Sequence, residues 1–357
     1  MSDPLSTVVV QDRLNTFGGG ERVVKHLSDS VPGEVEIITG NYEPAGTYDF
    51  SEHTIKELDE NSLLSFTRAR LQIDWNQYDI AFLSGNRPQF LQLLELPIPT
   101  IRYCHSPTRT FWSLRDYHFR QADLIKKGMR LVAAPAYRNI DAYLNRKHDL
   151  IITNSQNIRS QVSRFYGLPA TAVSPPVDVD TFEYTPHEGY WLSVNRLVPK
   201  KRVELQIESF IDLDETLVIV GSVDREFAEF GQQLKNRIEN SDNIRLEESV
   251  SETRLQQLYA GAKGVLYTPL FEDFGIVPVE AMASGKPVVA VAEGGPLETV
   301  QNGHTGWLVE PTVSDIRDTV TADFNPDAFR VACQKQSQRY STDQFENQIK
   351  HIVEEFD

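Results

Sequence analysis

The sequence predicts an α/β protein built from two doubly wound domains. Its 357 residues exceed what one ordinary hydrophobic core accommodates and suit two domains, each with its own core. Short apolar runs alternate with helix-length stretches along the whole chain, an order typical of βαβ units. Most of these runs are apolar throughout, as expected of parallel strands that helices cover on both faces.

Five of the expected strands lie in the first half of the chain and six in the second. Those of the first half are Thr7–Val10, Val35–Thr39, Asp79–Ser84, Pro99–Cys104 and Leu150–Asn154. Those of the second half are Tyr190–Val194, Thr216–Gly221, Asn243–Glu247, Gly264–Thr268, Val288–Ala292 and Gly306–Val309. Helices are expected between them, for example at Arg202–Ile211 and Leu255–Ala260.

The join between the domains is expected near Ser174–Pro176. Two successive prolines fit neither a central strand nor a helix interior, and they stiffen a connection. We therefore expect domains at residues 1–175 and 176–340, followed by a closing segment, 341–357, that contains a helix at Gln344–Phe356.

The composition is that of a globular protein without a membrane span. Hydrophobic residues make up 40% of the chain, and no apolar run approaches the roughly 20 residues that a spanning helix needs. Met1–Val10 lacks the basic and apolar regions of a secretory signal. The only cysteines, Cys104 and Cys333, lie far apart; this favours a reducing, cytoplasmic compartment over a disulfide framework or a zinc site.

The charge is distributed unevenly. The chain has a formal net charge of −16, which argues against a nucleic-acid-binding surface. Residues 102–148, in contrast, contain ten Lys and Arg residues against three Asp. Such a local excess of positive charge indicates an anionic partner for this segment.

Polar and glycine-rich segments follow several expected strands, where ligands of open α/β sheets bind. Gly19 and Gly20 lie in a glycine run that opens an expected helix, so its main chain can approach a phosphate. Arg196 and Lys201 follow a strand of the second half and could hold a diphosphate between them. His105 follows a strand of the first half. Each motif also has a structural alternative. The glycine run could be a flexible turn, Arg196 and Lys201 could belong to a solvated basic loop, and His105 could be a structural histidine.

Two carboxylates are spaced eight residues apart in the second half. Glu272 precedes a loop glycine, and Glu280 lies in the expected helix Val279–Ala283. Carboxylates suit polyol ligands because each accepts two or more hydrogen bonds from hydroxyl groups. A further glycine pair, Gly294 and Gly295, follows the next strand and again allows close approach of the main chain to a phosphate. The alternative for the carboxylates is a pair of surface acids.

These motifs together resemble those of the family-4 retaining glycosyltransferases, which have the two-domain GT-B fold. The resemblance covers most of the chain and is strongest from Tyr190 to Val309. An E-x7-E element is present as Glu272 and Glu280, and an Arg-x4-Lys element as Arg196 and Lys201. The family usually has glycine before this arginine, where the present chain has Asn195, a change that could tighten the turn.

Two further segments carry the resemblance. The sequence Gly-Gly-Gly-Glu-Arg at residues 18–22 matches the glycine loop of the family, and Tyr-Cys-His-Ser-Pro at 103–107 resembles a subgroup that contains many mannosyltransferases. The resemblance implies two Rossmann-like domains that face a central cleft. It also implies that the closing helix crosses back to the N-terminal domain.

The resemblance implies a role for each matching residue. Arg196 and Lys201 neutralise the donor diphosphate, Glu280 holds the ribose, and Glu272 holds hydroxyl groups of the transferred sugar. His105 contacts that sugar from the first domain, and Gly19 and Gly20 approach the phosphates and the acceptor. The main-chain N–H groups that assist Glu272 belong to the consecutive residues Asp273, Phe274, Gly275 and Ile276.

The resemblance also implies the substrates. The donor is a nucleotide-sugar, GDP-mannose before UDP-hexoses, and the acceptor is a glycan or a polyprenyl-linked glycan. Catalysis is expected without a metal or another cofactor, because no Asp-x-Asp element directly follows an expected strand. The basic, aromatic-rich segment 102–148 then has two interpretations: it binds an anionic membrane or lipid-linked acceptor, so that the protein is peripheral on the inner face of the membrane, or it merely forms a solvated helical hairpin.

Two other functions remain open on the sequence alone. A nucleotide-sugar epimerase of similar two-domain fold would use the same donor without an acceptor, and a non-catalytic protein would bind the nucleotide-sugar without turnover.

Overall fold

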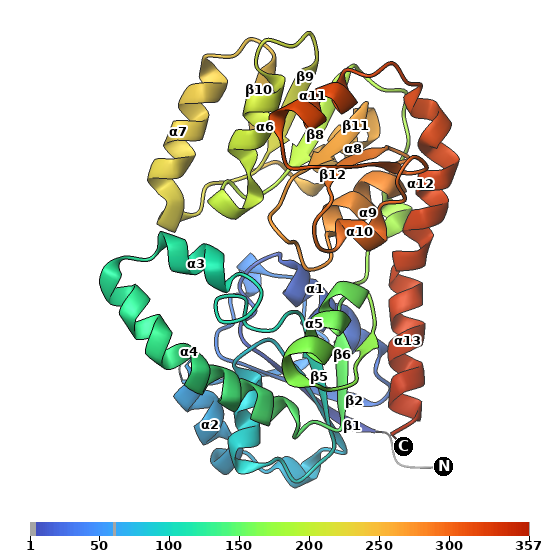
Figure 1. Cartoon of the computed structure of the whole chain (residues 1–357). Coiled ribbons are helices and arrows are strands. Elements are labelled where there is room, and N and C mark those ends of the chain that lie inside the picture. Colours follow the sequence, from blue (N-terminus) through green and yellow to red (C-terminus); the bar gives the residue numbers. More distant parts are fainter. Residues whose placement is uncertain (1–4, 60–61, 357) are drawn as a thin grey trace. The chain divides into compact units, whose positions relative to one another are not determined.

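The chain folds into two compact units. The structure, a computed structural model, describes residues 5–59 and 62–356. Unit 1 comprises Met1–Pro176 with Phe345–Asp357, and unit 2 comprises Val177–Gln344. Each unit has a parallel sheet between helices (Figure 1). The expected join near Ser174–Pro176 lies beside the boundary between the units.

Unit 1 contains a seven-stranded sheet in the order β3-β2-β1-β4-β5-β6-β7. Its strands are β1 (Ser6–Gln11), β2 (Glu34–Thr39), β3 (Thr54–Glu57), β4 (Ile80–Ser84), β5 (Thr100–Cys104), β6 (Leu150–Thr153) and β7 (Thr171–Ala172). Its helices are α1 (Gly19–Ser30), α2 (Leu63–Gln72), α3 (Arg115–Gln121), α4 (Leu124–Asn145), α5 (Gln156–Tyr166) and the last helix of the chain, α13 (Thr342–Glu354).

Unit 2 contains a six-stranded parallel sheet in the order β10-β9-β8-β11-β12-β13. Its strands are β8 (Tyr190–Val194), β9 (Thr216–Val220), β10 (Ile244–Glu247), β11 (Gly264–Tyr267), β12 (Val288–Val291) and β13 (Gly306–Val309). Its helices are α6 (Val203–Phe210), α7 (Ala228–Glu239), α8 (Glu252–Gly261), α9 (Ile276–Ala283), α10 (Pro296–Thr299), α11 (Val313–Val320) and α12 (Arg330–Ser337).

The predicted fold class is confirmed, and all the expected strands are present to within a residue at either end. Two strands, β3 and β7, were not predicted from the sequence. In β3, Thr-Ile-Lys-Glu lies at the sheet edge with three of its four residues exposed, and β7 has only two residues. Neither segment buries enough apolar surface to give the continuous hydrophobic pattern by which the central strands were recognised.

The last helix contributes to the core of unit 1. In α13, Phe345, Ile349 and Val353 are spaced so that they share one helix face, and all three are buried among residues of β1, β4 and β5. The ring of Phe345 lies 6.4 Å from that of Tyr103 in β5. Segments from the two ends of the chain therefore build a single core.

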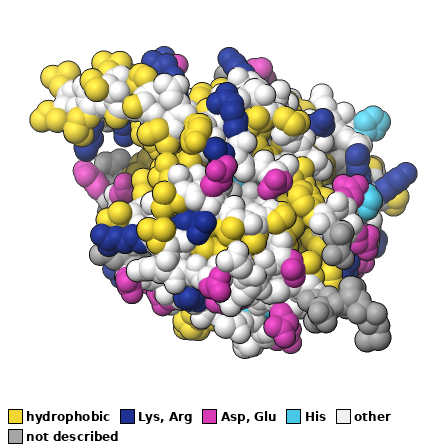
Figure 2. Space-filling view, turned by 90° about the horizontal axis from the view of Figure 1, so that it is seen from below, with side chains coloured by type: hydrophobic (Ala, Val, Ile, Leu, Met, Phe, Trp, Pro, Cys, Tyr) yellow, Lys and Arg dark blue, Asp and Glu magenta, His cyan; other side chains and the backbone are white. Residues whose placement is uncertain are grey.

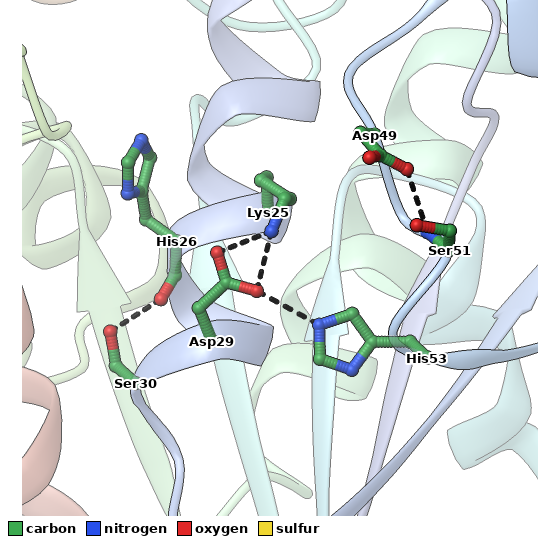
Figure 3. A network of polar contacts seen from close by, with 7 residues as sticks. All are labelled: Lys25, His26, Asp29, Ser30, Asp49, Ser51 and His53. Atoms are coloured by element: carbon green, nitrogen blue, oxygen red, sulfur yellow. Dashed lines mark hydrogen bonds and ion pairs between the residues drawn. The ribbon is translucent and has the colours of Figure 1, made fainter.

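Polar contacts fix the outer face of α1 to the segment that precedes β3 (Figure 3). The carboxylate of Asp29 accepts from Lys25 Nζ at 2.6 Å, one helical turn earlier, and lies 2.9 Å from His53 Nε2. Asp49 caps the turn before His53, accepting from the main-chain N–H of Ser51 at 2.9 Å. The opposite face of α1 buries Val23, Val24 and Leu27 against the sheet, so α1 is held from both sides.

Replacing Phe345 tests the contribution of α13 to unit 1. We expect Phe345→Ala to lower the free energy of unfolding by about 3 to 5 kcal/mol, because it leaves a cavity beside Tyr103. Urea unfolding followed by circular dichroism measures this change. His351→Ala, on the exposed face of the same helix, is the control and should change stability by less than about 0.5 kcal/mol. Equal effects of the two substitutions would show that α13 is not part of the core.

Candidate functional site

The sheet of unit 2 has its topological switch point between β8 and β11. From this pair the strand order runs outward in opposite directions, to β9 and β10 on one side and to β12 and β13 on the other. Ligands of open parallel sheets bind where the connections diverge, beyond the carboxyl ends of the strands. The loops after β8 and β11 are the segments that carry the predicted Arg-x4-Lys and E-x7-E elements.

Main-chain hydrogen bonds join three loops at this switch point. The N–H of Leu270, after β11, donates to the carbonyl of Lys200, after β8, at 2.8 Å. The N–H of Gly295, after β12, donates to the carbonyl of Glu272 at 2.7 Å. A Cβ on Gly295 would lie 2.0 Å from the carbonyl oxygen of Phe274, so only glycine permits this approach.

Lys201 and Glu272 face each other between the loops. Lys201 Nζ forms an ion pair with the carboxylate of Glu272, and each side chain is about one-fifth exposed, at 21% and 22%. Behind them Tyr267 is buried, and its pKa is raised well above the usual value by burial and then by the negative charge of Glu272. The structure therefore brings together two of the predicted residues as a partly shielded pair of opposite charges.

Arg196 lies apart from this pair. Its side chain is 65% exposed, and its guanidinium forms an ion pair with Asp224, on the loop after β9, at 3.2 Å. An exposed pair of this kind is worth at most about 1 kcal/mol, so little free energy holds the arginine in this orientation.

Glu280 is buried inside α9. Its carboxylate accepts from the hydroxyl of Tyr259, in α8, at 2.8 Å. Gly275, directly before α9, has φ +91°, a left-handed conformation that favours glycine, and no side chain caps the helix. The N–H groups of the first turn thus point toward the same end of the sheet as Glu272. The ring of Phe274 is buried against Tyr340, which leaves only the main chain of Phe274 for a ligand.

Asn195 belongs to a buried network at the end of β8. Its Nδ2 donates to Ser193 Oγ at 2.7 Å, and Ser193 donates to Gln206 of α6 at 2.6 Å. Gln206 in turn donates to Thr268 at 2.8 Å, and the Thr268 hydroxyl donates to the carbonyl of Lys201 at 3.0 Å. This network connects the ends of β8 and β11 through side chains. This network was not predicted, because Ser, Gln and Thr in a buried segment form no sequence motif that indicates hydrogen bonds between them.

Unit 1 has a second polar cluster at its own switch point, between β1 and β4. His105, after β5, has Nε2 2.9 Å from Ser84 Oγ, at the end of β4. Gly20 lies in the first turn of α1, and a Cβ added there would lie 3.8 Å from the same His105 nitrogen. Gly19, Gly20 and His105 thus lie at one end of the sheet, after β1 and β5; their roles stay predictions.

His105 is neutral under ordinary conditions. Burial, and then the positive charge of Arg102, lower its pKa to about 4. At neutral pH the imidazole can therefore exchange hydrogen bonds as donor and acceptor but carries no charge.

Asp12 is a residue of this cluster that the sequence reading missed. Its carboxylate accepts from the main-chain N–H groups of Asn86 at 3.1 Å and Arg87 at 2.8 Å, and burial raises its pKa. The neighbouring Gly85 has φ +94°, and a Cβ there would lie 2.7 Å from the Asp12 carboxylate. Asp12 thus fixes the loop after β4 next to Ser84. The signal in the sequence that could have indicated this contact is Gly85, which directly follows the strand that ends at Ser84.

One expectation about the basic segment is wrong. Arg102 is one of the ten cations of that segment, but its side chain, in β5, is fully buried and is not available to an anionic partner. It faces Asp141 of α4, Tyr166 of α5 and Cys104.

In the described residues, 5–59 and 62–356, no group of three or more His, Cys, Asp or Glu side chains is arranged to hold a metal ion.

Comparison with known proteins identifies the family. Residues 17–181 match the family described as Glycosyltransferase Family 4, and residues 184–338 match the one described as Glycosyl transferases group 1. The chain belongs to the family-4 glycosyltransferases. The prediction drawn from the E-x7-E and Arg-x4-Lys elements is therefore confirmed for the family, whereas the roles of the individual residues stay predictions.

Several similar curated proteins are named as mannosyltransferases. The chain is 28% identical over 263 residues to alpha-1,3/1,6-mannosyltransferase ALG2 of Saccharomyces cerevisiae, covering 58% of this chain and 50% of the yeast protein. It is 30% identical over 240 residues to ALG2 of Homo sapiens, covering 58% and 55%. The chain thus spans about half the length of these relatives.

Two solved structures share the fold. The HepE protein of Anabaena, in complex with UDP and glucose, superposes with a TM-score of 0.77 at 16% identity and covers 98% of this chain and 99% of its own. Sucrose-phosphate synthase from Thermosynechococcus elongatus superposes with a TM-score of 0.79 at 15% identity, covering 98% of each chain.

The low pKa of His105 predicts a pH dependence of stability. Between pH 6.5 and 4 the unfolded chain binds a proton at this residue and the folded chain does not, so the free energy of unfolding falls as the pH is lowered through this range. The loss from His105 alone is at most about 3 kcal/mol. Urea unfolding at pH 7 and pH 4.5 should show a smaller acid-induced loss for His105→Gln than for the wild type. An identical loss in both proteins would mean that His105 is not held neutral.

Proposed function

We propose that the protein is a retaining hexosyltransferase that moves a sugar, preferably mannose, from a nucleotide-diphosphate sugar to a glycan or lipid-linked glycan, without a metal ion. The observation that carries the proposal is the grouping of Lys201, Glu272 and Glu280 at the switch point of the unit 2 sheet. The names of the relatives support mannose, and the fold is shared with a structure solved in complex with UDP-glucose.

Lys201 and Arg196 supply the positive charge for the diphosphate in this proposal. Lys201 is held between loops by its contacts with Glu272, so it is preorganised. Arg196 is exposed and weakly paired with Asp224, so it can turn toward a phosphate at small cost. Charge that develops on the leaving diphosphate as the glycosidic bond breaks strengthens both interactions, which lowers the barrier.

Glu280 and Glu272 bind hydroxyl groups. Buried Glu280 is oriented by the hydroxyl of Tyr259, and a carboxylate fixed in this way can accept two hydrogen bonds from the ribose diol. Glu272 takes hydroxyl groups of the transferred sugar, assisted by the N–H groups of residues 273–276. Neutral His105 exchanges hydrogen bonds with the sugar without attracting a competing anion.

Retention of the anomeric configuration follows in this proposal from reaction on one face of the sugar. The bond between the anomeric carbon and the diphosphate oxygen breaks, and the acceptor oxygen forms the new bond on the same face. The acceptor proton passes to the leaving phosphate oxygen, so no protein carboxylate acts as a nucleophile. In this respect the reaction differs from that of retaining glycosidases, which use a nucleophile and an acid about 5 Å apart.

A thermal-shift panel tests the donor site. GDP-mannose, GDP, UDP-glucose, UDP-N-acetylglucosamine and UDP are each added to the wild-type protein, and we expect stabilisation by the nucleotides of one base. A ligand at a hundredfold excess over Kd stabilises the folded state by about 2.7 kcal/mol. Glu280→Ala should abolish the shift, while Glu310→Ala, an exposed glutamate of the same unit, should retain it. If no nucleotide stabilises the wild-type protein, the proposed function is wrong.

Turnover with the selected donor tests the reaction and its metal independence. We expect release of the nucleoside diphosphate to depend on an added glycan acceptor, to continue in EDTA, and to give a product with the anomeric configuration of the donor by proton NMR. Loss of activity in EDTA that Mg²⁺ restores would contradict the metal-free mechanism. Binding without acceptor-dependent turnover would indicate a non-catalytic protein.

A further inference from the structure

Helix α4 exposes an apolar stripe along its whole length. Its side chains are spaced three, four or eight residues apart, which places them on one helix face. The stripe consists of Ile125 (77% exposed), Met129 (61%), Val132 (81%), Ile140 (44%) and Tyr143 (50%). Leu124 adds to it at the N-terminal end, at 86%. Figure 2 shows hydrophobic side chains gathered on the projecting part of unit 1 at its upper left, where α3 and α4 lie.

The polarity of α4 is inverted relative to a helix on a protein surface. In its first ten residues the cationic side chains of Lys127 and Arg130 contact α3, whereas the aliphatic ones of Ile125, Met129 and Val132 are exposed. Lys127 lies over the ring of Phe119 in α3, with its Nζ 5.8 Å from the ring centroid, and Arg130 donates to the carbonyl of His118. An ordinary surface helix buries its aliphatic side chains instead.

A pocket with three arginines in its lining lies between α3 and α4, on the side of α4 that faces α3. It has a volume of about 70 Å³, and its lining includes Arg115, Arg130, Arg138, Phe111, Phe119 and Leu131. Arg138 donates to the carbonyl of Phe111 at 2.7 Å. Within the described residues, Arg130 and Arg138 bond main-chain oxygens and form no ion pair, so their charges are available to an anion.

We propose that α3 and α4 form a docking element for a bilayer that contains anionic phospholipids. The apolar stripe of α4 enters the interface between head groups and acyl chains, and the arginine pocket binds lipid phosphate. In this arrangement the long stem of Lys126, whose side chain is 62% exposed, lies beside the apolar face and its ammonium group reaches the head groups. The proposal concerns binding only and does not depend on the identity of the sugar donor.

Charge complementarity selects a lipid surface as the partner. Residues 115–138 contain six Lys and Arg against two Asp, although the whole chain has a net charge of −16. An anionic surface therefore attracts this element and repels much of the remaining molecule, which orients the protein. No helix in the described part of the chain is long and apolar enough to cross a membrane, so the docking proposed here is in the plane of the interface.

Co-sedimentation with vesicles tests the proposal. The wild-type protein is mixed with vesicles of phosphatidylcholine alone or with 30% phosphatidylglycerol, a composition chosen to give an anionic surface, at low and high salt. We expect binding to the anionic vesicles that weakens with salt. Ile125→Glu with Val132→Glu should weaken it about tenfold or more, and so should Arg130→Gln with Arg138→Gln.

Matched controls separate lipid binding from loss of folding. Val331→Glu changes a side chain of α12 in unit 2 that is 75% exposed, and it should bind vesicles as the wild type does. Thermal melting should confirm that all variants fold, and their nucleotide-induced shifts should equal that of the wild type, so failure of this proposal is distinct from failure of the proposed function.

Three outcomes would overturn the proposal. The first is absence of wild-type binding to anionic vesicles at low salt. The second is equal binding by the wild type and Ile125→Glu with Val132→Glu. The third is a wild-type dimer in solution that the same substitutions dissociate, because the stripe would then be covered by a second copy of the chain.

Discussion

The ion pair between Lys201 and Glu272 is the interaction on which the candidate donor site depends. It lies at the one place in the unit 2 sheet where the connections diverge, and main-chain hydrogen bonds from Leu270 and Gly295 fix the loops on either side. These bonds tie the loop that carries Lys201 to the loop that carries Glu272, so the lysine is preorganised. A cation held in this way stabilises developing negative charge without a cost for reorganisation. The proposed role in catalysis is a consequence of this rigidity rather than of the lysine charge alone.

In unit 1, too, hydrogen bonds fix the loops at the carboxyl ends of the strands, but the side chains they position are different. Asp12 fixes the loop after β4 through two N–H groups, and Ser84 orients His105. The unit 2 site presents a cation and carboxylates, whereas the unit 1 cluster is neutral at His105 because burial lowers its pKa to about 4. The apolar stripe of α4 is separate from both clusters. Its proposed role is to dock the protein on a lipid surface, not to bind the substrates at the sheet ends.

Much of the fold and part of the site could be predicted from the sequence. Central strands were found because their residues are apolar on both faces, and the positions of Lys201, Glu272 and Glu280 followed from counting residues after strands. The pairing of Arg196 with Asp224 could not be predicted, because a long exposed side chain has many rotamers of similar energy. Burial of Arg102 was missed because a lone cation in a strand gives no periodic signal.

The sequence pattern of α4 shows that the helix is amphipathic but not which of its faces contacts the protein. That the apolar face is directed outward became evident only from the packing of Lys127 and Arg130 against α3.

Calorimetric titration of Lys201→Met with matched nucleotides tests most directly whether this lysine recognises the diphosphate. GDP is compared with GMP, and UDP with UMP, in the wild type, in Lys201→Met and in Glu272→Gln. Methionine keeps the apolar stem and removes the charge. We predict that Lys201→Met loses most of the wild-type preference for the diphosphate while its affinity for the monophosphate changes little, and that Glu272→Gln keeps the preference. An unchanged ratio of diphosphate to monophosphate affinity in Lys201→Met would contradict the proposed donor site.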